Sequence, residues 1–354
     1  MMMRKIFTVF LAACFLFLCI SPGFAEDTAL KSGTIFLCGE AHSDSACLEK
    51  ELEAWSECYE NGMRDLFIEY PSYTAAYLNR WMQEDTDELL DMIFTDFRGT
   101  NNDSPQSRDF YRSIKSAFPD TVFHGTDVGH QFDTTGARYL SLLESEGKQD
   151  TPEYRLAALT VEQGRKYYDI GRTDETTAWV YREYCMVDNF LRAWEELGRR
   201  DIMGIYGSAH TDPGSLDISG SIPCMAAQLT GRLQDAVRCK DLTKNDLISA
   251  DTVTINGKEY QASYFGSQDI SSWAQGYLKR DFWRVENAYD DLKDAPRTGN
   301  WLPAGNYNMV VNPGEIYIVE YTQTDGTLER LYYLCDGTLY SDGVYNTFNI
   351  TVSE

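Results

Sequence analysis

The sequence predicts an α/β protein with a mostly parallel sheet flanked by helices, followed by a β-rich C-terminal accessory region. Over the first two thirds of the chain, short apolar runs alternate with helical patterns, which is the order of βαβ units. After about residue 240 the pattern changes to β-branched and aromatic residues that alternate between turns. These two observations together predict one α/β unit and a smaller β-rich one.

Four apolar runs are expected to form buried parallel strands, at 34–38, 66–68, 121–123 and 202–206. The clearest helical pattern follows His42, where Leu48, Leu52, Trp55 and Tyr59 recur at intervals of three and four residues. The remaining helices are expected at 72–83, 85–95, 105–117, 134–146, 152–168 and 173–198.

Two hairpins are expected in the accessory region. Residues 252–255 and 258–265 flank Asn256-Gly257, a pair that readily supplies the positive φ angles of a type I′ turn. Residues 315–321 and 327–334 repeat the pattern around Asp325-Gly326. A helix is expected between the hairpins, from Trp273 to Asp294.

The first 25 residues have the features of a signal peptide. Arg4 and Lys5 precede an apolar run that is shorter than a membrane span, and small residues before Glu26 suit a peptidase. Cys14 could instead be the lipidated residue of a lipobox, but the apolar stretch left behind it argues against that. We therefore expect a signal peptide at 1–25, an α/β domain at 26–240 and the accessory region at 241–354, in a secreted or extracytoplasmic protein without a membrane span in the mature chain.

Charge and cysteine content exclude two classes of protein. The formal charge of −24 would repel a phosphate backbone, so we expect no nucleic acid partner. Beyond the signal segment, the cysteines show no CxxC pair or zinc-ribbon spacing. We expect buried free thiols, with one or two disulfides left open.

Ionisable residues follow each of the four expected strands. They are Glu40 and His42 in Gly39-Glu40-Ala41-His42, Glu69, His124 with Asp127, and His210 in Gly207-Ser208-Ala209-His210. The carboxyl ends of parallel strands point to one edge of a sheet, where ligands bind. The sequence therefore predicts that four separate segments bring His42, Glu69, Asp127 and His210 to one crevice.

The glycines and the following helix fit such a crevice. Gly39 and Gly207 lie where the chain leaves a strand sharply and the backbone must approach its neighbours closely. A helix is expected to begin just after His42, with Ser43 or Asp44 as its N-cap. The positive end of its dipole would then favour an anionic intermediate.

The long expected helix carries polar residues within its apolar stripe. Arg182, Glu183 and Asn189 lie at neighbouring helical positions among residues that should face the core. Arg182 could pair with Glu69 or Asp127, bind a substrate carboxylate or oxyanion, or form an internal salt bridge with Glu183.

Each of these residues also has a structural explanation. Glu69 could cap the next helix, Asp127 could be a turn residue, and Glu40 could be a solvated loop charge. His124 could simply be a histidine at a strand end. The repetition of Gly-x-x-His at two strand ends favours a site for His42 and His210.

The succession GEAH, IEYP, HGTD, REYCMVDN and GSAH resembles a superfamily that includes erythromycin-esterase-like proteins, ChaN-type haem-iron lipoproteins and the TraB and Tiki proteins. The resemblance spans roughly residues 33–215 and implies a parallel sheet with site residues at its strand ends. It does not extend to the C-terminal region, and no macrolide-specific signature is evident.

The resemblance implies roles for these residues. His42 would be the general base that activates water, Glu40 and Glu69 would orient it or share its proton, and His210 and Arg182 would complete the pocket. In the Tiki branch the paired motifs serve a divalent-metal protease, which implies that His42, His210 and Glu69 could hold manganese, cobalt or zinc.

Three functions therefore stay open. The first is a hydrolase acting on an ester, lactone or amide carbonyl of a small-molecule or peptide substrate, with or without a metal. The second is a haem-iron binding protein of the ChaN type. The third is a recognition protein that acts through its accessory region.

Overall fold

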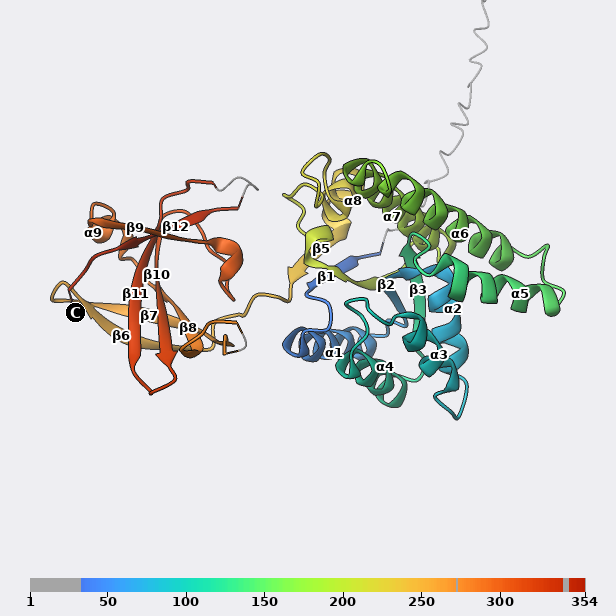
Figure 1. Cartoon of the computed structure of the whole chain (residues 1–354), viewed down its shortest axis with the longest axis horizontal. Helices are drawn as coiled ribbons and strands as arrows, with labels where there is room; N and C mark the ends of the chain where they lie inside the picture. Colours follow the sequence, from blue (N-terminus) through green and yellow to red (C-terminus); the bar gives the residue numbers. More distant parts are fainter. Residues whose placement is uncertain (1–32, 272, 340–343, 354) are drawn as a thin grey trace, which may run out of the picture. The chain divides into compact units, whose positions relative to one another are not determined.

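The computed structural model describes residues 33–271, 273–339 and 344–353 (Figure 1). They form two sheets, one of five parallel strands with helices on both faces and one of seven antiparallel strands. This confirms the α/β fold class and the β-rich C-terminal region. The segment expected to be a signal peptide, including Cys14, lies outside the described residues.

The parallel sheet has the strand order β3-β2-β4-β1-β5. The four expected strands are all present, and their pairs are all parallel. A fifth strand, which the sequence analysis missed, pairs with β1 at the edge of the sheet. The strands are β1 (Ile35–Glu40), β2 (Asp65–Pro71), β3 (Val122–Asp127), β4 (Ile202–Gly207) and β5 (Val237–Asp241).

Seven of the helices on the parallel sheet, α1 to α7, agree closely with those expected from the apolar periodicity, whereas α8 was not expected. They are α1 (Ser45–Glu60), α2 (Ser72–Trp81), α3 (Glu88–Asp96), α4 (Pro105–Ala117), α5 (Ala137–Ser145), α6 (Pro152–Gly171), α7 (Glu175–Glu196) and α8 (Met225–Leu233). Short helical turns occur at η1 (Phe132–Gly136), η2 (Ser208–His210) and η3 (Gln234–Ala236).

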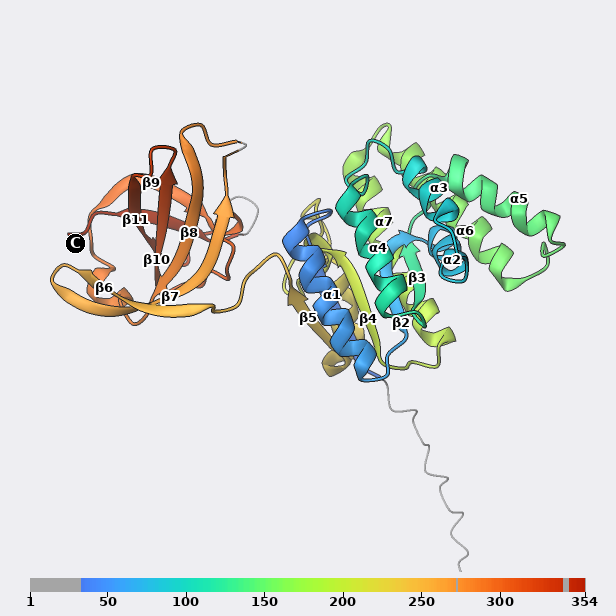
Figure 2. The same cartoon turned by 90° about the horizontal axis from the view of Figure 1, so that it is seen from below.

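The alternation of side chains along each strand divides the core between the two faces of the sheet. In β1, Ile35 and Leu37 join the cluster under α7 and α8, whereas Cys38 joins the cluster under α1 to α6. Helices α1 and α4 pack against each other on the second of these faces (Figure 2). Both faces are therefore covered, and the polar residues are concentrated at the strand ends.

The antiparallel sheet has the order β6-β7-β8-β10-β11-β12-β9. Its strands are β6 (Ser249–Ile255), β7 (Lys258–Asp269), β8 (Tyr277–Val285), β9 (Arg297–Pro303), β10 (Glu315–Gln323), β11 (Leu328–Cys335) and β12 (Asn346–Ile350), with a short turn η4 (Ala304–Asn306). Both expected hairpins are present. At the first one, Asn256 and Gly257 have φ angles of 50° and 76°, as the expected turn requires.

The helix expected from Trp273 to Asp294 was wrong. Strand β8 occupies the middle of that range, and only the four-residue helix α9 (Tyr289–Leu292) follows it. Phe282 packs in one apolar cluster of the sheet and Val285 in the other, so the apolar residues of β8 serve both faces. A strand buried on both faces lacks strict alternation, and a short run of that kind is ambiguous between strand and helix.

Two further expectations concern buried free thiols and membrane-spanning helices. The seven cysteines among the described residues are all free, and only Cys239 is not fully buried. None of the helices described is long and apolar enough to cross a membrane.

Candidate active site

Four strand ends of the parallel sheet bring ionisable side chains to one edge. Glu40 is the last residue of β1, Asp127 is the last of β3, and His210 follows β4 in η2. Glu69 lies in β2 at a shift in the strand register between Ile68 and Pro71. Such an irregularity re-aims side chains, and here Glu69 faces His42 and His210.

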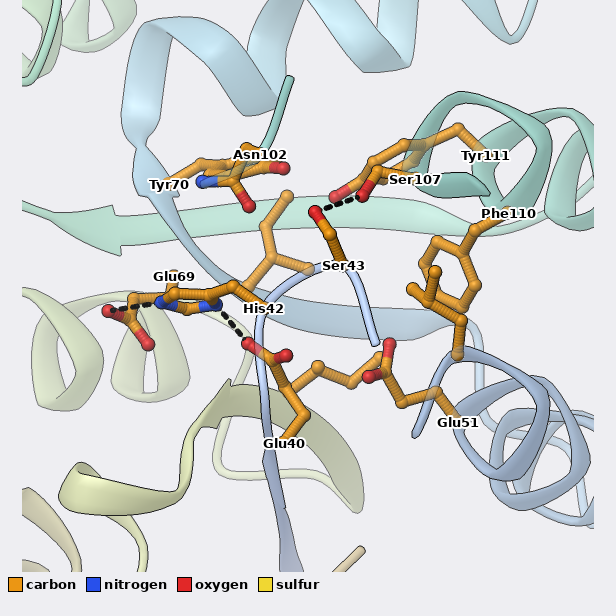
Figure 3. A pocket seen from close by; sticks show the side chains of 13 residues that line it. Glu40, His42, Ser43, Glu51, Glu69, Tyr70, Asn102, Ser107, Phe110 and Tyr111 are labelled. Carbon is orange, nitrogen blue, oxygen red and sulfur yellow. Dashed lines mark hydrogen bonds and ion pairs between the residues drawn. The ribbon is translucent and has the colours of Figure 1, made fainter. Parts of the chain in front are cut away.

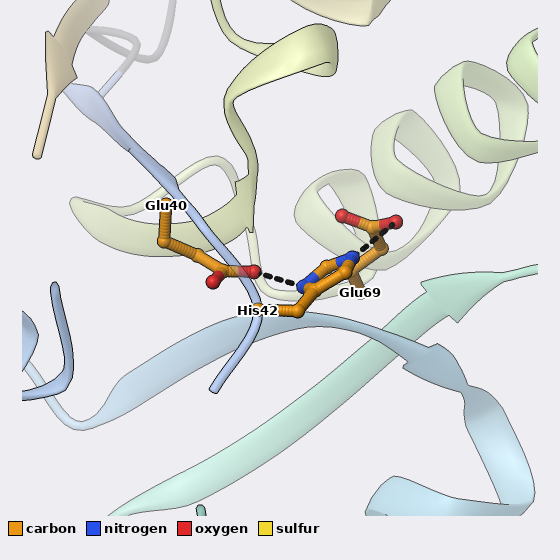
Figure 4. A group of neighbouring side chains, drawn as sticks. All are labelled: Glu40, His42 and Glu69. Atoms are coloured by element: carbon orange, nitrogen blue, oxygen red, sulfur yellow. Dashed lines mark ion pairs between the residues drawn. The ribbon is translucent and has the colours of Figure 1, made fainter. Parts of the chain in front are cut away.

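His42 lies between two buried carboxylates (Figure 4). Its Nδ1 contacts Glu40 Oε1, while its Nε2 faces Glu69 Oε1 at 3.8 Å, which is too long for a direct hydrogen bond. The side chain of His42 is 31% exposed, compared with 8% for each carboxylate. In its neutral form, His42 would donate Nδ1–H to Glu40 and leave Nε2 open as a base.

The two carboxylates beside His42, Glu40 and Glu69, strongly favour its protonated imidazolium form. The hydrogen bond to Glu40 raises the pKa of His42 to about 9; burial opposes this shift, and the charge of Glu69 adds to it. His42 is therefore protonated at neutral pH and becomes a base only as the pH rises.

Arg182 of α7 joins the second and third strand ends. Its Nε and Nη2 donate to the two oxygens of Asp127 at 2.9 and 2.7 Å, and Nη2 also lies 2.5 Å from Glu69 Oε1. Burial lowers the pKa of Arg182, but the charges of Asp127 and Glu69 raise it well above its usual value. Of the alternatives considered for Arg182, pairing with Glu69 and Asp127 is the one present, and no salt bridge to Glu183 is found among the described contacts.

Glu69 is held as a carboxylate from several sides. The backbone N–H of Gly207 donates to its Oε2 at 2.5 Å, and His210 Nε2 lies 3.6 Å from its Oε1. Burial disfavours the charge, but His210, Arg182 and His42 together lower the pKa of Glu69 below its usual value. Glu69 therefore fixes a negative charge beside His42.

The two Gly-x-x-His turns are not equivalent. His210 is buried behind Glu69, with 5% of its surface exposed. Its Nδ1 lies 2.7 Å from Glu183 Oε2, and Glu183 Oε1 accepts the backbone N–H of Met225 at the start of α8. His42 therefore faces the pocket, and His210 and Glu183 support Glu69 from inside the fold.

Two other candidates lie away from the pocket. Asn189 donates to Thr126 O at 3.0 Å and exchanges hydrogen bonds with Gln163, so it holds β3 against α6 and α7. His124 has the structural place considered for it, because its Nε2 lies 2.8 Å from Asp65 Oδ1 at the first residue of β2. Asp65 and Glu69 are four positions apart on the strand, about 13 Å.

The site also includes residues that the sequence analysis did not select. His130 Nε2 lies 3.1 Å from Asp127 Oδ2, and its Nδ1 lies 2.7 Å from the hydroxyl of Tyr168. The three-residue spacing from Asp127 was a signal for His130, whereas nothing local in the sequence indicated Tyr168 in α6.

The backbone beside His42 is strained. Ser43 has a φ of 62°, which is unusual for a residue with a side chain. Its hydroxyl bonds to the carbonyl of Asn101 and lies 2.9 Å from Ser107 Oγ. The following residue, Asp44, is the N-cap of α1 and accepts from the backbone N–H of Cys47 at 2.9 Å. Asp44 already offsets the positive end of that helix, so we assign α1 no role in stabilising an anion.

His42 and Glu69 line two cavities. The inner one, of about 40 Å³, extends under α1 and α4 and is shown in Figure 3. The outer one, of about 360 Å³, is lined by Arg182, His130 and Tyr168. Asn102 lines both cavities. A larger cavity and a small one therefore meet at the imidazole.

The donor set for a metal differs from the expected one. Glu40, His42 and Glu69 each offer a ligand atom within 4.8 Å of the others, and His210 is not part of this group. The guanidinium of Arg182 already lies against Glu69 Oε1, and His42 Nδ1 is already taken by Glu40. A divalent ion here would lie beside a fixed positive charge, so these residues fit a metal poorly.

No protein-family model matches the chain, and neither does any curated protein. Three solved structures are similar to it. A Bacillus cereus protein has 13% identity, covers 81% of this chain and 85% of its own, and has a TM-score of 0.43. A succinoglycan biosynthesis protein has 14% identity, coverages of 66% and 71%, and a TM-score of 0.43. An erythromycin esterase variant in its open conformation has 10% identity, coverages of 71% and 83%, and a TM-score of 0.44. Likenesses this loose carry no argument about the chemistry of this chain.

Proposed function

We propose that the protein is an exported hydrolase in which His42 activates a water that attacks an ester, lactone or amide carbonyl. The observation that carries this proposal is the orientation of the imidazole. Glu40 holds Nδ1, and Nε2 faces Glu69 beside an open cavity. In a histidine general base, a carboxylate orients one ring nitrogen and the other nitrogen is available to accept a proton.

The reaction would proceed in two proton transfers. A water bound near Nε2 of neutral His42 loses a proton to it while its oxygen attacks the carbonyl carbon. The imidazolium that forms is stabilised by Glu40 and Glu69, and it returns the proton to the leaving oxygen or nitrogen as the carbon–heteroatom bond breaks. Asn102, which lines both cavities, is our candidate donor to the oxyanion.

Arg182, Asp127, His210 and Glu183 are positioning residues in this proposal. Arg182 and His210 contact Glu69, while Asp127 contacts Arg182 and Glu183 contacts His210. They fix the carboxylate that faces Nε2, and that carboxylate favours the imidazolium formed during attack.

A metal-dependent hydrolase is the second candidate, because Glu40, His42 and Glu69 converge within 4.8 Å. It ranks lower because of the guanidinium at Glu69. Metal analysis of the purified protein, before and after dialysis against a chelator, separates the two. Stoichiometric metal together with activity that is lost on chelation and restored by manganese, cobalt or zinc would establish the metal version.

The test of the main proposal is a panel of esters, lactones and short peptides assayed with the wild type, His42→Gln and His124→Gln. We expect His42→Gln to lose turnover by about 10² to 10⁴-fold, the usual contribution of a general base. His124→Gln is the matched control, because His124 bonds Asp65 away from the site. If nothing in the panel is turned over and hemin gives a saturable absorbance band, the proposal is wrong and a ChaN-like function takes its place.

A further inference from the structure

Glu51 of α1 is a buried carboxyl that the proposed reaction does not use. It is 2% exposed, and its Oε1 has no hydrogen-bond partner among the described residues. Figure 3 shows its side chain directed from α1 into the inner cavity, next to Glu40 and below Ser43. Buried carboxyl oxygens are normally satisfied, so an unpartnered one that lines a cavity requires an explanation.

The charged neighbours of Glu51 do not supply a partner. Burial raises the pKa of Glu51 well above its usual value, and the charges of Glu40 and Asp44 raise it further, while His42 lowers it. No lysine or arginine is among the described residues that line the cavity. His42 already bonds Glu40, so the main influence on Glu51 is its burial, which favours the neutral carboxyl.

The cavity walls suit a small cation. Tyr70, Phe110 and Tyr111 line it, and aromatic rings attract ammonium groups. The hydroxyls of Ser43 and Ser107 line it as well and can accept hydrogen bonds. A volume of about 40 Å³ has room for one or two groups the size of a water molecule, so it admits an ammonium head but not a ring.

We propose that the inner cavity binds a primary ammonium group, with Glu51 as its counter-ion. The ammonium would donate to Glu51 and to the serine hydroxyls while its attached carbon contacts the aromatic walls. On binding, Glu51 ionises and its proton leaves to solvent, so the charge of the cation is compensated. The positive partner of Glu51 is then supplied by the ligand, because no lysine or arginine among the described lining residues supplies one.

This site gives the proposed hydrolase a substrate class, and that extension rests on the proposed function. His42 and Glu69 line the same cavity, so an ammonium held by Glu51 would lie close to the reacting carbonyl. The remainder of the substrate would occupy the outer cavity, which shares His42 and Glu69. Esters or amides that carry a primary amine near the scissile bond would therefore be preferred over neutral ones of the same length.

The binding test needs no turnover. Methylammonium chloride is titrated into the wild type by calorimetry, against potassium chloride at equal ionic strength, in two buffers of different ionisation enthalpy. We expect saturable binding with release of up to one proton per ligand, and binding that tightens as the pH rises, because Glu51 then ionises more readily. Potassium chloride should give no comparable signal.

Three variants complete the design. Glu51→Gln keeps the shape without the charge and should bind at least about tenfold more weakly with no proton release, because a charge-assisted hydrogen bond is lost. Glu53→Gln, on an exposed position of the same helix, is the control and should match the wild type. His42→Gln should still bind methylammonium, so failure of the hydrolase proposal and failure of this one are distinguishable.

Two results would overturn the inference. One is equal heats for methylammonium and potassium, and the other is unchanged binding in Glu51→Gln. Thermal unfolding shows whether Glu51→Gln folds, and it should be at least as stable as the wild type, since an unpaired buried carboxyl is replaced by a neutral amide.

Discussion

Arg182 Nη2 lies 2.5 Å from Glu69 Oε1, and this contact joins helix α7 to the edge of the sheet where His42 lies. The same nitrogen lies 2.7 Å from Asp127 Oδ2. One cation thus compensates two carboxylates that are 8% and 1% exposed. Without it, these two buried carboxylates would have only neighbouring histidines as charged partners.

Replacing Arg182 by Met should therefore lower the free energy of unfolding by about 3–5 kcal/mol, the usual cost of breaking a buried ion pair from one side. Chemical denaturation at pH 7 measures this loss. Arg172→Met is the control, because Arg172 and its partner Asp169 are 76% and 66% exposed and such a pair contributes about 0–1 kcal/mol. Equal losses in the two variants would contradict the role assigned to Arg182.

Catalysis by His42 should depend on pH in a definite direction. Because Glu40 raises the pKa of His42 to about 9, the neutral base forms only as the pH approaches that value. The kcat/KM should rise from pH 6 to about pH 9 for any substrate that the protein turns over. In Glu40→Gln the hydrogen bond to a carboxylate is lost, so the rising limb should move toward the ordinary histidine pKa of about 6.5 while the plateau falls. A limb that stays in place would exclude His42 as the titrating base.

The same shift predicts the sign of a stability effect. A pKa that is raised in the folded state means that the imidazole binds its proton more tightly there than in the unfolded chain. His42 therefore contributes stability below about pH 6.5, and that contribution is lost as the pH rises through about 9. Thermal melting of the wild type and of Glu40→Gln should be measured across this pH range. The difference between their Tm values should become smaller as the pH increases.

The strand-end residues were accessible from sequence because each follows its own apolar run. Glu40, Glu69, Asp127 and His210 needed only the rule that parallel strands end at one edge. Their separate roles were not accessible. Whether His210 is open or buried depends on how Glu183 of α7 packs behind it. Their function stays a prediction until variants are measured.

The parts that sequence reasoning missed depend on packing between distant segments. Glu51 occupies an ordinary helical position, and only the cavity between α1 and α4 makes it unusual. Strand β8 was mistaken for a helix because its apolar residues serve two opposed cores. In both cases the deciding information lies in tertiary contacts, which local periodicity does not contain.

The position of the first strand end depends on Gly39. A Cβ there would lie 2.2 Å from Thr211 Oγ1 and 3.2 Å from the backbone Cα of Ser208, so a side chain would push β1 away from the turn that follows β4. Gly39→Ala should cost about 1–3 kcal/mol as an overpacked site, and it should lower turnover because Glu40 and His42 follow directly.

Substitution of Thr211 tests whether this close contact causes the loss of stability. Its Oγ1 is the atom closest to the added methyl group, whereas its Cβ lies 3.4 Å away, within reach of ordinary contact. Thr211→Ala removes the close atom, so the double variant should recover part of the stability that Gly39→Ala loses. A double-mutant cycle measured by denaturant unfolding gives the coupling energy between the two substitutions. The double variant should lose less stability than the sum of the losses of the two single variants. Strict additivity would show that the strand end adjusts without Thr211, and the close approach of β1 to η2 would then not be what positions His42.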